Sequence, residues 1–210
     1  MQNTLYNAAK KFGELCNKGY HIVLGRKNQM YRLDIRFPAE SFYHLIGLQH
    51  LEDLTFPSKN KERIYKEILS GRITQEFIEK SIFYKEWNIE ERTEVSIYLE
   101  EMLDHLPQYF RINLIEFKKN TRIKADYLAL LHSSENEKKF VYYFLIHSYL
   151  YELPNRFVSC SLFRKQDKDY LRGTSKTTIL LMEKIVNIDK NEVIELYRNP
   201  NYKDKEESSF

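Results

Sequence analysis

The spacing of apolar residues changes at Pro107. Upstream of this proline, apolar side chains recur at every third or fourth position, which is the period of an amphipathic helix. The longest such stripe is Val95, Tyr98, Leu99, Met102, Leu103 and Leu106. Downstream, apolar and polar residues alternate, as they do in strands with one buried face. The change predicts an α+β fold in which a helical N-terminal half, with a short β-hairpin, packs on a C-terminal antiparallel β-sheet.

The N-terminal half is expected to contain several helices and one hairpin. A helix beginning near Leu5 should end at Gly19, because glycine readily adopts the left-handed conformation of a helix stop. The hairpin should pair Tyr20–Leu24 with Gln29–Phe37 through a turn at residues 25–28, since the second segment alternates apolar and polar side chains. The other expected helices are Ala39–Leu48, Lys59–Ser70, a short helix capped by Thr74, and Ile89–Leu106 with Asn88 as its N-cap.

The strands expected after Pro107 are Asn113–Phe117, Tyr127–Leu131, Phe140–His147, Phe157–Arg164 and Thr177–Ile185. The polar connection at residues 133–137 is short enough for a hairpin turn. The sequence has no internal repeat and no low-complexity linker, so we expect residues 1–198 to form a single domain. Residues 199–210 are strongly charged and should form a frayed tail.

Several classes of protein and site are disfavoured by the sequence. Residues 1–16 lack the apolar run of a signal peptide, and no stretch approaches the ~18 apolar residues of a membrane span, so we expect a cytoplasmic protein without a membrane partner. Cys16 and Cys160 are too few for a disulfide framework. His44 and His50 should lie on opposite faces of a regular helix, and no Gly-rich phosphate loop is present. We therefore expect neither a metal site nor a cofactor.

Charge is unevenly distributed along the chain, although the formal net charge is only +3. Residues 1–110 carry a net −1 and residues 177–210 a net −2, whereas residues 111–176 carry 13 Lys and Arg against 7 Asp and Glu, a net +6. The densest run of cations is the loop Lys118-Lys119-Asn120-Thr121-Arg122-Ile123-Lys124. Loops of this kind grip the phosphates of nucleic acids, although a run of cations is more often a solvated turn.

A few further residues could carry chemistry. On the expected helix, His44 shares a face with Gly47, where a ligand can approach closely, although a lone helical histidine is more often a packing residue. On the expected strand 157–164, alternation places Ser159 and Ser161 on one face with the two phenylalanines of that strand. The next segment is either an ordinary charged loop or a binding loop. Its candidate residues are Arg164, Lys168, Asp169, Tyr170, Arg172 and Lys176.

Two of these segments resemble a known family. The run Phe42-Tyr43-His44-Leu45-Ile46-Gly47-Leu48, which follows an expected strand ending at Phe37-Pro38, resembles the His-Leu-x-Gly element of a phage-associated nuclease group in the Barnase–EndoU–colicin–RelE-like superfamily. The run Ser161-Leu162-Phe163, followed by Asp169-Tyr170, Gly173, Lys176 and an apolar strand, resembles that group's closing segment. The order of helices before sheet also fits, and the resemblance extends over residues 20–185.

The resemblance implies a metal-independent ribonuclease, toxin-like or a phage effector, in which the 2′-hydroxyl of RNA attacks the adjacent phosphate. His44 would be the acid or the base. The superfamily's usual basic residue on the first sheet strands corresponds to either Lys124 or Arg122. The catalytic residues expected on this basis are His44, Lys124, Ser159 and Lys176. The expected RNA-binding residues are Lys118, Lys119, Arg122, Ser161, Arg164, Tyr170 and Arg172.

The alternative is a non-catalytic phage or prophage protein that inhibits a host protein or binds RNA without cleaving it. The glutamates between residues 90 and 101 would suit a basic partner, although they also describe a solvated helix face. RNA is thus one expected partner, and an antitoxin or a host target is the other.

Overall fold

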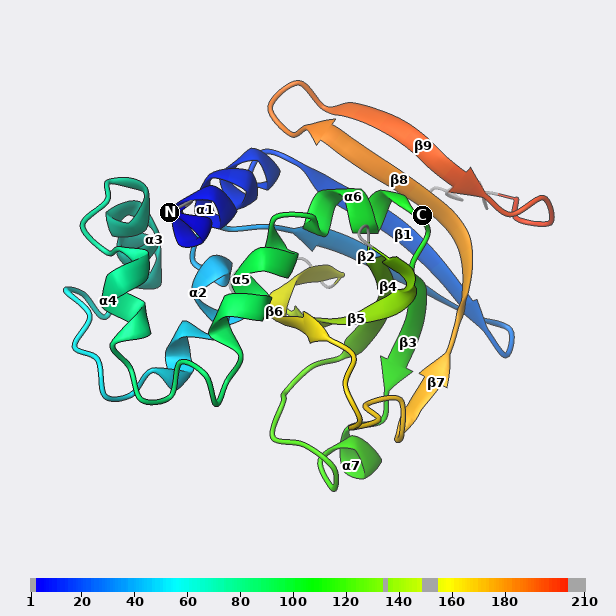
Figure 1. Cartoon of the computed structure of the whole chain (residues 1–210). Helices are drawn as coiled ribbons and strands as arrows, with labels where there is room; N and C mark the ends of the chain where they lie inside the picture. The colour runs from blue at the N-terminus through cyan, green and yellow to red at the C-terminus, as the bar shows by residue number, and fades with distance from the viewer. Residues whose placement is uncertain (1–2, 134–135, 149–154, 204–210) are drawn as a thin grey trace.

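A computed structural model describes residues 3–133, 136–148 and 155–203 of the chain. Its strands are β1 (Gly19–Arg26), β2 (Gln29–Arg36), β3 (Gln108–Ile112), β4 (Tyr127–Ser133), β5 (Asn136–His147), β6 (Arg156–Arg164), β7 (Thr174–Lys176), β8 (Thr178–Asn187) and β9 (Glu192–Arg198). Together they form one curled sheet with the order β7-β3-β4-β5-β6-β2-β1-β8-β9 (Figure 1). Neighbouring strands are antiparallel, except that β2 and β6 run parallel.

This sheet contradicts the predicted α+β arrangement of a helical half packed on a C-terminal antiparallel sheet. The hairpin β1–β2 is not an accessory of the helices, because it lies inside the sheet between β6 and β8. The physical reason is visible in β1, where the consecutive residues Ile22, Val23 and Leu24 are all buried. A strand buried on both faces needs strands beside it and layers above and below it, which an isolated hairpin does not supply. The sheet therefore takes strands from both ends of the chain.

The helices are α1 (Thr4–Leu15), α2 (Ser41–Leu45), α3 (Lys61–Leu69), α4 (Gln75–Glu79), α5 (Ile89–Ser96), α6 (Leu99–Asp104) and α7 (Leu114–Phe117), with a 3-10 helix η1 (Leu48–His50). Figure 1 shows α1 to α5 grouped at one end of the sheet, while α7 lies apart near β3 and β7. Side chains that alternate along β4 and β5 divide between two apolar clusters. The larger core includes residues of α1 to α6, and the smaller core surrounds Phe117 of α7, Tyr142 and Phe144.

The predicted helix Ile89–Leu106 is in fact two helices. α5 ends at Ser96, and α6 begins at Leu99. Thr93 Oγ1 donates to the carbonyl of Ile89, and Ser96 Oγ donates to the carbonyl of Thr93, each at 2.7 Å. Hydroxyls that bond back to helix carbonyls compete with the backbone N–H donors and bend the helix. An apolar stripe of regular spacing does not reveal this break.

Three other local predictions are wrong. Asn113–Phe117 is not a strand, because Asn113 Oδ1 accepts from the Ile115 N–H at 3.1 Å and caps α7 instead. Asn88 does not cap α5 with its side chain, and its φ is 50°. Gly19 begins β1 rather than ending α1, which ends at Leu15. The glycine is needed for close packing, because a Cβ at this position would lie 2.7 Å from the Ile35 carbonyl oxygen. Strands β3, β7 and β9 were not predicted.

Two predicted segments lie partly outside the described residues. They are the hairpin turn, at residues 134–135, and the frayed tail, at residues 204–210. The described start of that tail is packed, because Tyr202 is only 9% exposed and contacts a small apolar cluster with Val23 and Leu181.

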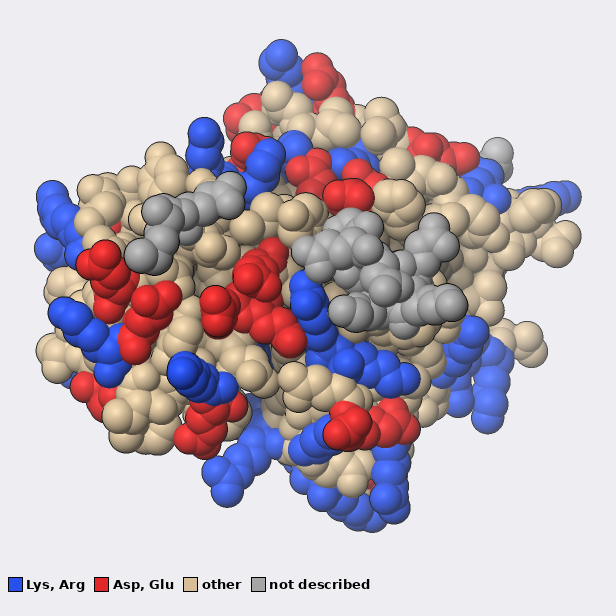
Figure 2. All heavy atoms as spheres, in the orientation of Figure 1, with Lys and Arg blue, Asp and Glu red and all other residues tan. Residues whose placement is uncertain are grey.

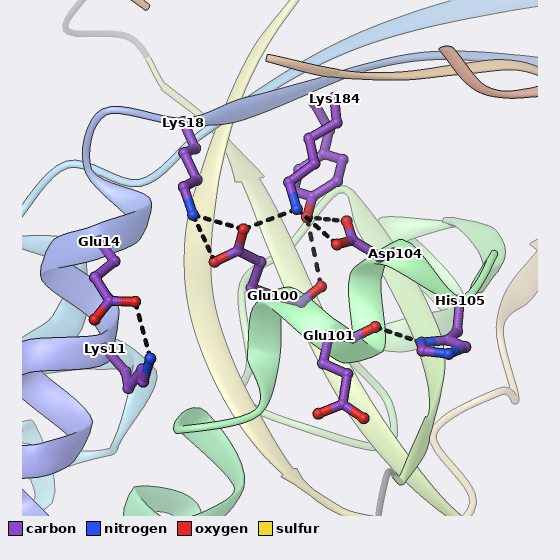
Figure 3. Close-up of polar contacts among 9 residues, drawn as sticks. Lys11, Glu14, Lys18, Glu100, Glu101, Asp104, His105 and Lys184 are labelled. Atoms are coloured by element: carbon purple, nitrogen blue, oxygen red, sulfur yellow. Dashed lines mark hydrogen bonds and ion pairs between the residues drawn. The ribbon is translucent and has the colours of Figure 1, made fainter. Parts of the chain in front are cut away.

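A partly buried ion-pair network connects α6 to β8 and to the start of β1 (Figure 3). Lys184 Nζ lies 2.6 Å from Asp104 Oδ2 and 2.7 Å from Glu100 Oε1. Lys18 donates to the same Glu100, and Tyr20 OH donates to Asp104 Oδ1, both at 2.7 Å. Burial alone would raise the pKa of Glu100, but the hydrogen bonds from Lys18 and Lys184 hold it below its usual value. Burial opposes the charge of Lys184, but its two carboxylate partners raise its pKa overall.

Lys184→Met should destabilise the protein by about 2–3 kcal/mol, because it removes the cation that two partly buried carboxylates share. Asp104 loses its ion pair, whereas Glu100 keeps the one with Lys18. Part of this loss should vanish in acid. The lowered pKa of Glu100 means that its contribution is present above the ordinary carboxyl pKa and is lost as the pH falls through the lowered value. Urea unfolding of both proteins at neutral pH and at about pH 3 measures the difference.

The control is Lys66→Met, which removes an exposed ion pair with Glu62. This change should cost less than ~0.5 kcal/mol. Equal losses for Lys184→Met and Lys66→Met would contradict a structural role for the network.

Candidate active site

A cleft of about 1060 Å³ is lined by residues of α2, η1, the first turn of α5, the loop at residues 118–124 and β6, together with Lys168 and Tyr170. Among the described residues that line it, cations greatly outnumber carboxylates. The cations are Lys61, Arg92, Lys118, Lys119, Arg122, Lys124 and Lys168, and the carboxylates are Glu40 and Glu52. A cleft with this imbalance has a positive potential that concentrates anionic ligands.

The loop after α7 forms the basic rim of the cleft. Lys118, Lys119, Arg122 and Lys124 all line it, and Figure 2 shows Lys and Arg side chains crowded where Figure 1 places α7. Lys119 Nζ is paired with a carboxylate of α7, Glu116, at 2.8 Å. The loop that was predicted to bind phosphates therefore lines the same cleft as His44 and His50.

His44 stands in the last turn of α2 and lines the cleft. Burial lowers the pKa of its imidazole, the positive charge of Lys61 lowers it further, and the Gln49 side chain acts in the opposite direction. The net effect is a pKa below the ordinary value, so that the ring is neutral at neutral pH. A neutral imidazole can accept a proton from a substrate.

His50 lies in the same cleft, contrary to its predicted place on the opposite face of a helix. α2 ends at Leu45, and Gly47 turns the chain with a φ of 85° into η1. His50 Nε2 lies 3.1 Å from Gln49 Nε2, and its ring stacks on Trp87 with 3.8 Å between centroids and 6° between planes. The left-handed turn at glycine replaces the regular helix on which the prediction rested.

A β-bulge separates the two serines of β6. Ser159 pairs with Leu145 and Ser161 pairs with Phe144, which leaves Cys160 as an extra residue. Leu145 belongs to the larger core and Phe144 to the smaller core, so the serines point to opposite faces of the strand. The expectation that they share a face is wrong, because a bulge inverts the alternation on which it was based.

The hydroxyls of these serines have different partners. Ser159 is 2% exposed and its Oγ lies 2.7 Å from the hydroxyl of Tyr143, which is completely buried. Ser161 Oγ instead accepts from Arg92 Nη1 at 3.0 Å. Of the two hydroxyls, that of Ser161 is therefore the one tied to a cation of the cleft.

Arg92 of α5 is the most unusual residue that the sequence prediction missed. It is 8% exposed, and its Nε donates to the Trp87 carbonyl at 3.0 Å. Its guanidinium carbon lies 4.8 Å from the ring centre of Phe163. Burial lowers the pKa of Arg92 to about 10. The only sequence signal was an arginine in a glutamate-rich helix, which describes a surface residue equally well.

Eleven residues were predicted for the site, and most of them line this cleft. Those that do are His44, Lys118, Lys119, Arg122, Lys124, Ser159, Ser161 and Tyr170. Lining residues that were not predicted include His50, Trp87 and Arg92. Lys168 also lines the cleft; it was named as a candidate of its loop but was given no role.

The three remaining predicted residues lie elsewhere. Lys176 is on β7 opposite Phe110, and Arg172 is in the turn before β7. Arg164 ends β6, where its backbone N–H donates to Glu91 Oε1 at 3.3 Å, and it lines a separate groove of about 590 Å³ beside α1. The roles predicted for these three residues stay predictions.

Two further properties of the described residues bear on function. No three His, Cys, Asp or Glu side chains within residues 3–133, 136–148 and 155–203 gather as a metal site would require. None of the helices in that part of the chain is both long enough and apolar enough to cross a bilayer.

Comparison with known proteins identifies a nuclease family. The model of the family described as phage-Barnase-EndoU-ColicinE5/D-RelE like nuclease4 matches residues 4–200, which is nearly the whole chain. No curated protein and no solved structure matches the chain. The family match confirms the resemblance seen in the sequence and extends it at both ends.

Gly47→Ala should destabilise the protein more than Gly71→Ala, although both glycines have a positive φ, of 85° and 75°. The left-handed backbone costs an alanine about 1–2 kcal/mol at either position. Only at Gly47 would the new Cβ meet neighbours, at 3.1 Å from Ile89 Cδ1 and 3.2 Å from Arg92 Cδ. We expect about 1 kcal/mol of additional loss there by chemical denaturation. Equal losses would show that the turn does not pack tightly on α5.

Proposed function

The chain belongs to the phage-Barnase-EndoU-ColicinE5/D-RelE like nuclease family, and we propose that it is a metal-independent ribonuclease whose active site is the cleft around His44. The family is one of phage-associated nucleases, so nucleic acid is the substrate class. The choice of RNA, and of its 2′-hydroxyl as nucleophile, is supported by a cleft that offers histidines and many cations. A toxin-like or phage effector role is part of the same proposal.

Transesterification needs a base for the 2′-hydroxyl proton, positive charge at the phosphorane and an acid for the leaving 5′-oxygen. His44 is assigned as the base, because its lowered pKa keeps it neutral. The 2′-hydroxyl proton passes to His44, the bond from the 2′-oxygen to phosphorus forms, the bond to the 5′-oxygen breaks, and the leaving oxygen takes up a proton from water. The observation that carries the proposal is a half-buried, neutral histidine in a cleft where the lining cations outnumber the carboxylates.

The remaining assignments follow from position in the cleft. Lys124 and Arg122 are both candidates for the charge at the reacting phosphate, and the structure leaves both facing the cleft. Ser159 and Ser161 are the two candidates for holding the phosphate, and the buried hydroxyl of Ser159 is already bonded to Tyr143. The proposal therefore gives that contact to Ser161.

His44→Ala should lower RNA cleavage by about 10²–10⁴-fold with little change in RNA affinity, because a neutral base contributes to proton transfer and little to phosphate binding. The assay is cleavage of total RNA in EDTA, with DNA as the inert substrate. The matched control is His105→Ala, since His105 lies at the end of α6, outside the cleft, with its Nδ1 2.7 Å from the Glu101 carbonyl oxygen.

The His44 assignment fails if His44→Ala cleaves RNA as the wild type does. If no form of the protein cleaves RNA but all bind it, the non-catalytic reading replaces the ribonuclease.

Reversing Arg122 and Lys124 to Glu should weaken binding of single-stranded RNA and flatten its salt dependence. Each lost phosphate contact removes about 0.7 from the slope of log affinity against log salt, so two should remove about 1.4. The same reversal at Lys80 and Lys85, exposed cations that do not line the cleft, is the control. A slope that changes equally in both double variants would show that RNA does not bind at this rim.

A further inference from the structure

We propose that Arg92 and Ser161 form a phosphate-binding subsite on the wall of this cleft. Neither the resemblance nor the family match points to Arg92, which lies on helix α5 rather than on a strand. The link to RNA rests on the proposed ribonuclease function, whereas the binding of a phosphate group by Arg92 does not.

The first observation concerns Arg92, a buried cation that is in ion-pair contact with no carboxylate of the described residues. Arg92 is 8% exposed, and none of the ion pairs among the described residues involves it. Burial lowers the pKa of Arg92, and the charge of the adjacent Glu91 acts in the opposite direction. The Glu91 carboxylate nevertheless accepts from the backbone N–H of Arg164 and is not in ion-pair contact with Arg92. Buried charges in proteins are normally paired, because removing an ion from water is costly. A bound anion would supply the missing partner.

The second observation is the fixed orientation of the guanidinium. Nε donates to the Trp87 carbonyl and Nη1 donates to Ser161 Oγ, each at 3.0 Å. The ring of Phe163 lies 4.8 Å from the guanidinium carbon. These contacts hold the planar group in place before any ligand arrives, which is the condition under which an arginine binds a phosphate most strongly.

The third observation is that donors remain. A guanidinium has five N–H groups, and within the described part of the chain only two hydrogen bonds from Arg92 are formed. Nη2 makes neither of these bonds, and it is not one of the fully buried atoms. Because Arg92 lines the cleft, Nη2 is open to a ligand there. A phosphate oxygen entering the cleft can thus accept from Nη2, while another accepts from the Ser161 hydroxyl.

The surroundings favour an anion at this point. Burial lowers the pKa of His50, and the positive charge of Arg92 lowers it further, because the two side chains are neighbours. Lys168 and Tyr170 also line the cleft, and Lys168 Nζ lies 5.0 Å from the centre of the Tyr170 ring. A phosphate at Arg92 would therefore lie in the same cleft as His44, Arg122 and Lys124.

The test uses the fluorescence of Trp87, the only tryptophan of the sequence. Its carbonyl bonds Arg92 and its ring stacks on His50, so an anion at Arg92 should change its emission. The wild type is titrated with inorganic phosphate and with a nucleoside 3′-monophosphate. We expect saturable changes, with affinity reduced about 10-fold or more in Arg92→Met and several-fold in Ser161→Ala.

Two variants keep the test decisive. Arg92→Lys retains the positive charge but not the planar, forked guanidinium. It should bind phosphate more weakly than the wild type and better than Arg92→Met, and it gives a result even if Arg92→Met is destabilised. Arg32→Met removes an exposed arginine of β2 that does not line the cleft, and should bind as the wild type does. Phosphate binding that is absent in the wild type, or unchanged in Arg92→Lys and Ser161→Ala, would overturn the subsite.

The two proposals fail separately. A protein that binds phosphate through Arg92 but cleaves no RNA keeps the subsite and loses the ribonuclease assignment. A protein that cleaves RNA but binds phosphate independently of Arg92 keeps the ribonuclease assignment and loses the subsite. Tighter binding of the nucleotide than of inorganic phosphate assigns the subsite to nucleic acid, and equal binding assigns it to free phosphate.

Discussion

The parallel pairing of Asp34–Arg36 on β2 with Arg156–Val158 on β6 holds the two parts of the sheet together. One part is β7-β3-β4-β5-β6, and the other is β2-β1-β8-β9. The chain leaves β2 and forms α2 almost at once, so this pairing brings α2 against β6. α5 packs on the same strand. The cleft lies where these helices meet β6 and the basic loop. Without the parallel pairing, His44 would have no fixed position relative to Ser161 or to the cations.

Two departures from regular structure determine which side chains enter the cleft. The left-handed turn at Gly47 ends the helical path and brings His50 onto Trp87. The bulge at Cys160 inverts the alternation of β6 and brings Ser161 to Arg92. A regular helix and a regular strand would have sent both residues to other faces. Irregularities of this kind concentrate at functional sites, where the surrounding structure compensates for their cost.

Local features of the fold could be predicted from the sequence. Lys27 and Asn28 both have positive φ in the expected hairpin turn, and Thr74 Oγ1 accepts from the Phe77 N–H at 3.2 Å as the expected cap. These depend on neighbours in sequence. The parallel pairing of β2 with β6 depends instead on residues far apart in the sequence. Alternation specifies which face of a strand is buried but not which strand lies alongside it.

The candidate site was predictable to a similar degree. His44 and the loop 118–124 were found because a histidine beside a glycine and a dense run of cations are visible in the sequence. The burial of Arg92 was not visible, since it depends on contacts with Trp87, Ser161 and Phe163 that the tertiary fold creates.

The central claim is that this cleft cleaves RNA through the 2′-hydroxyl. Mass spectrometry of the ends that the wild-type protein generates from a short RNA in EDTA tests it most directly. Attack by the 2′-oxygen leaves a 2′,3′-cyclic phosphate on one fragment and a 5′-hydroxyl on the other, and a single 2′-deoxynucleotide at the cleaved position should abolish the reaction. Fragments that carry a 5′-phosphate and a 3′-hydroxyl would contradict the account.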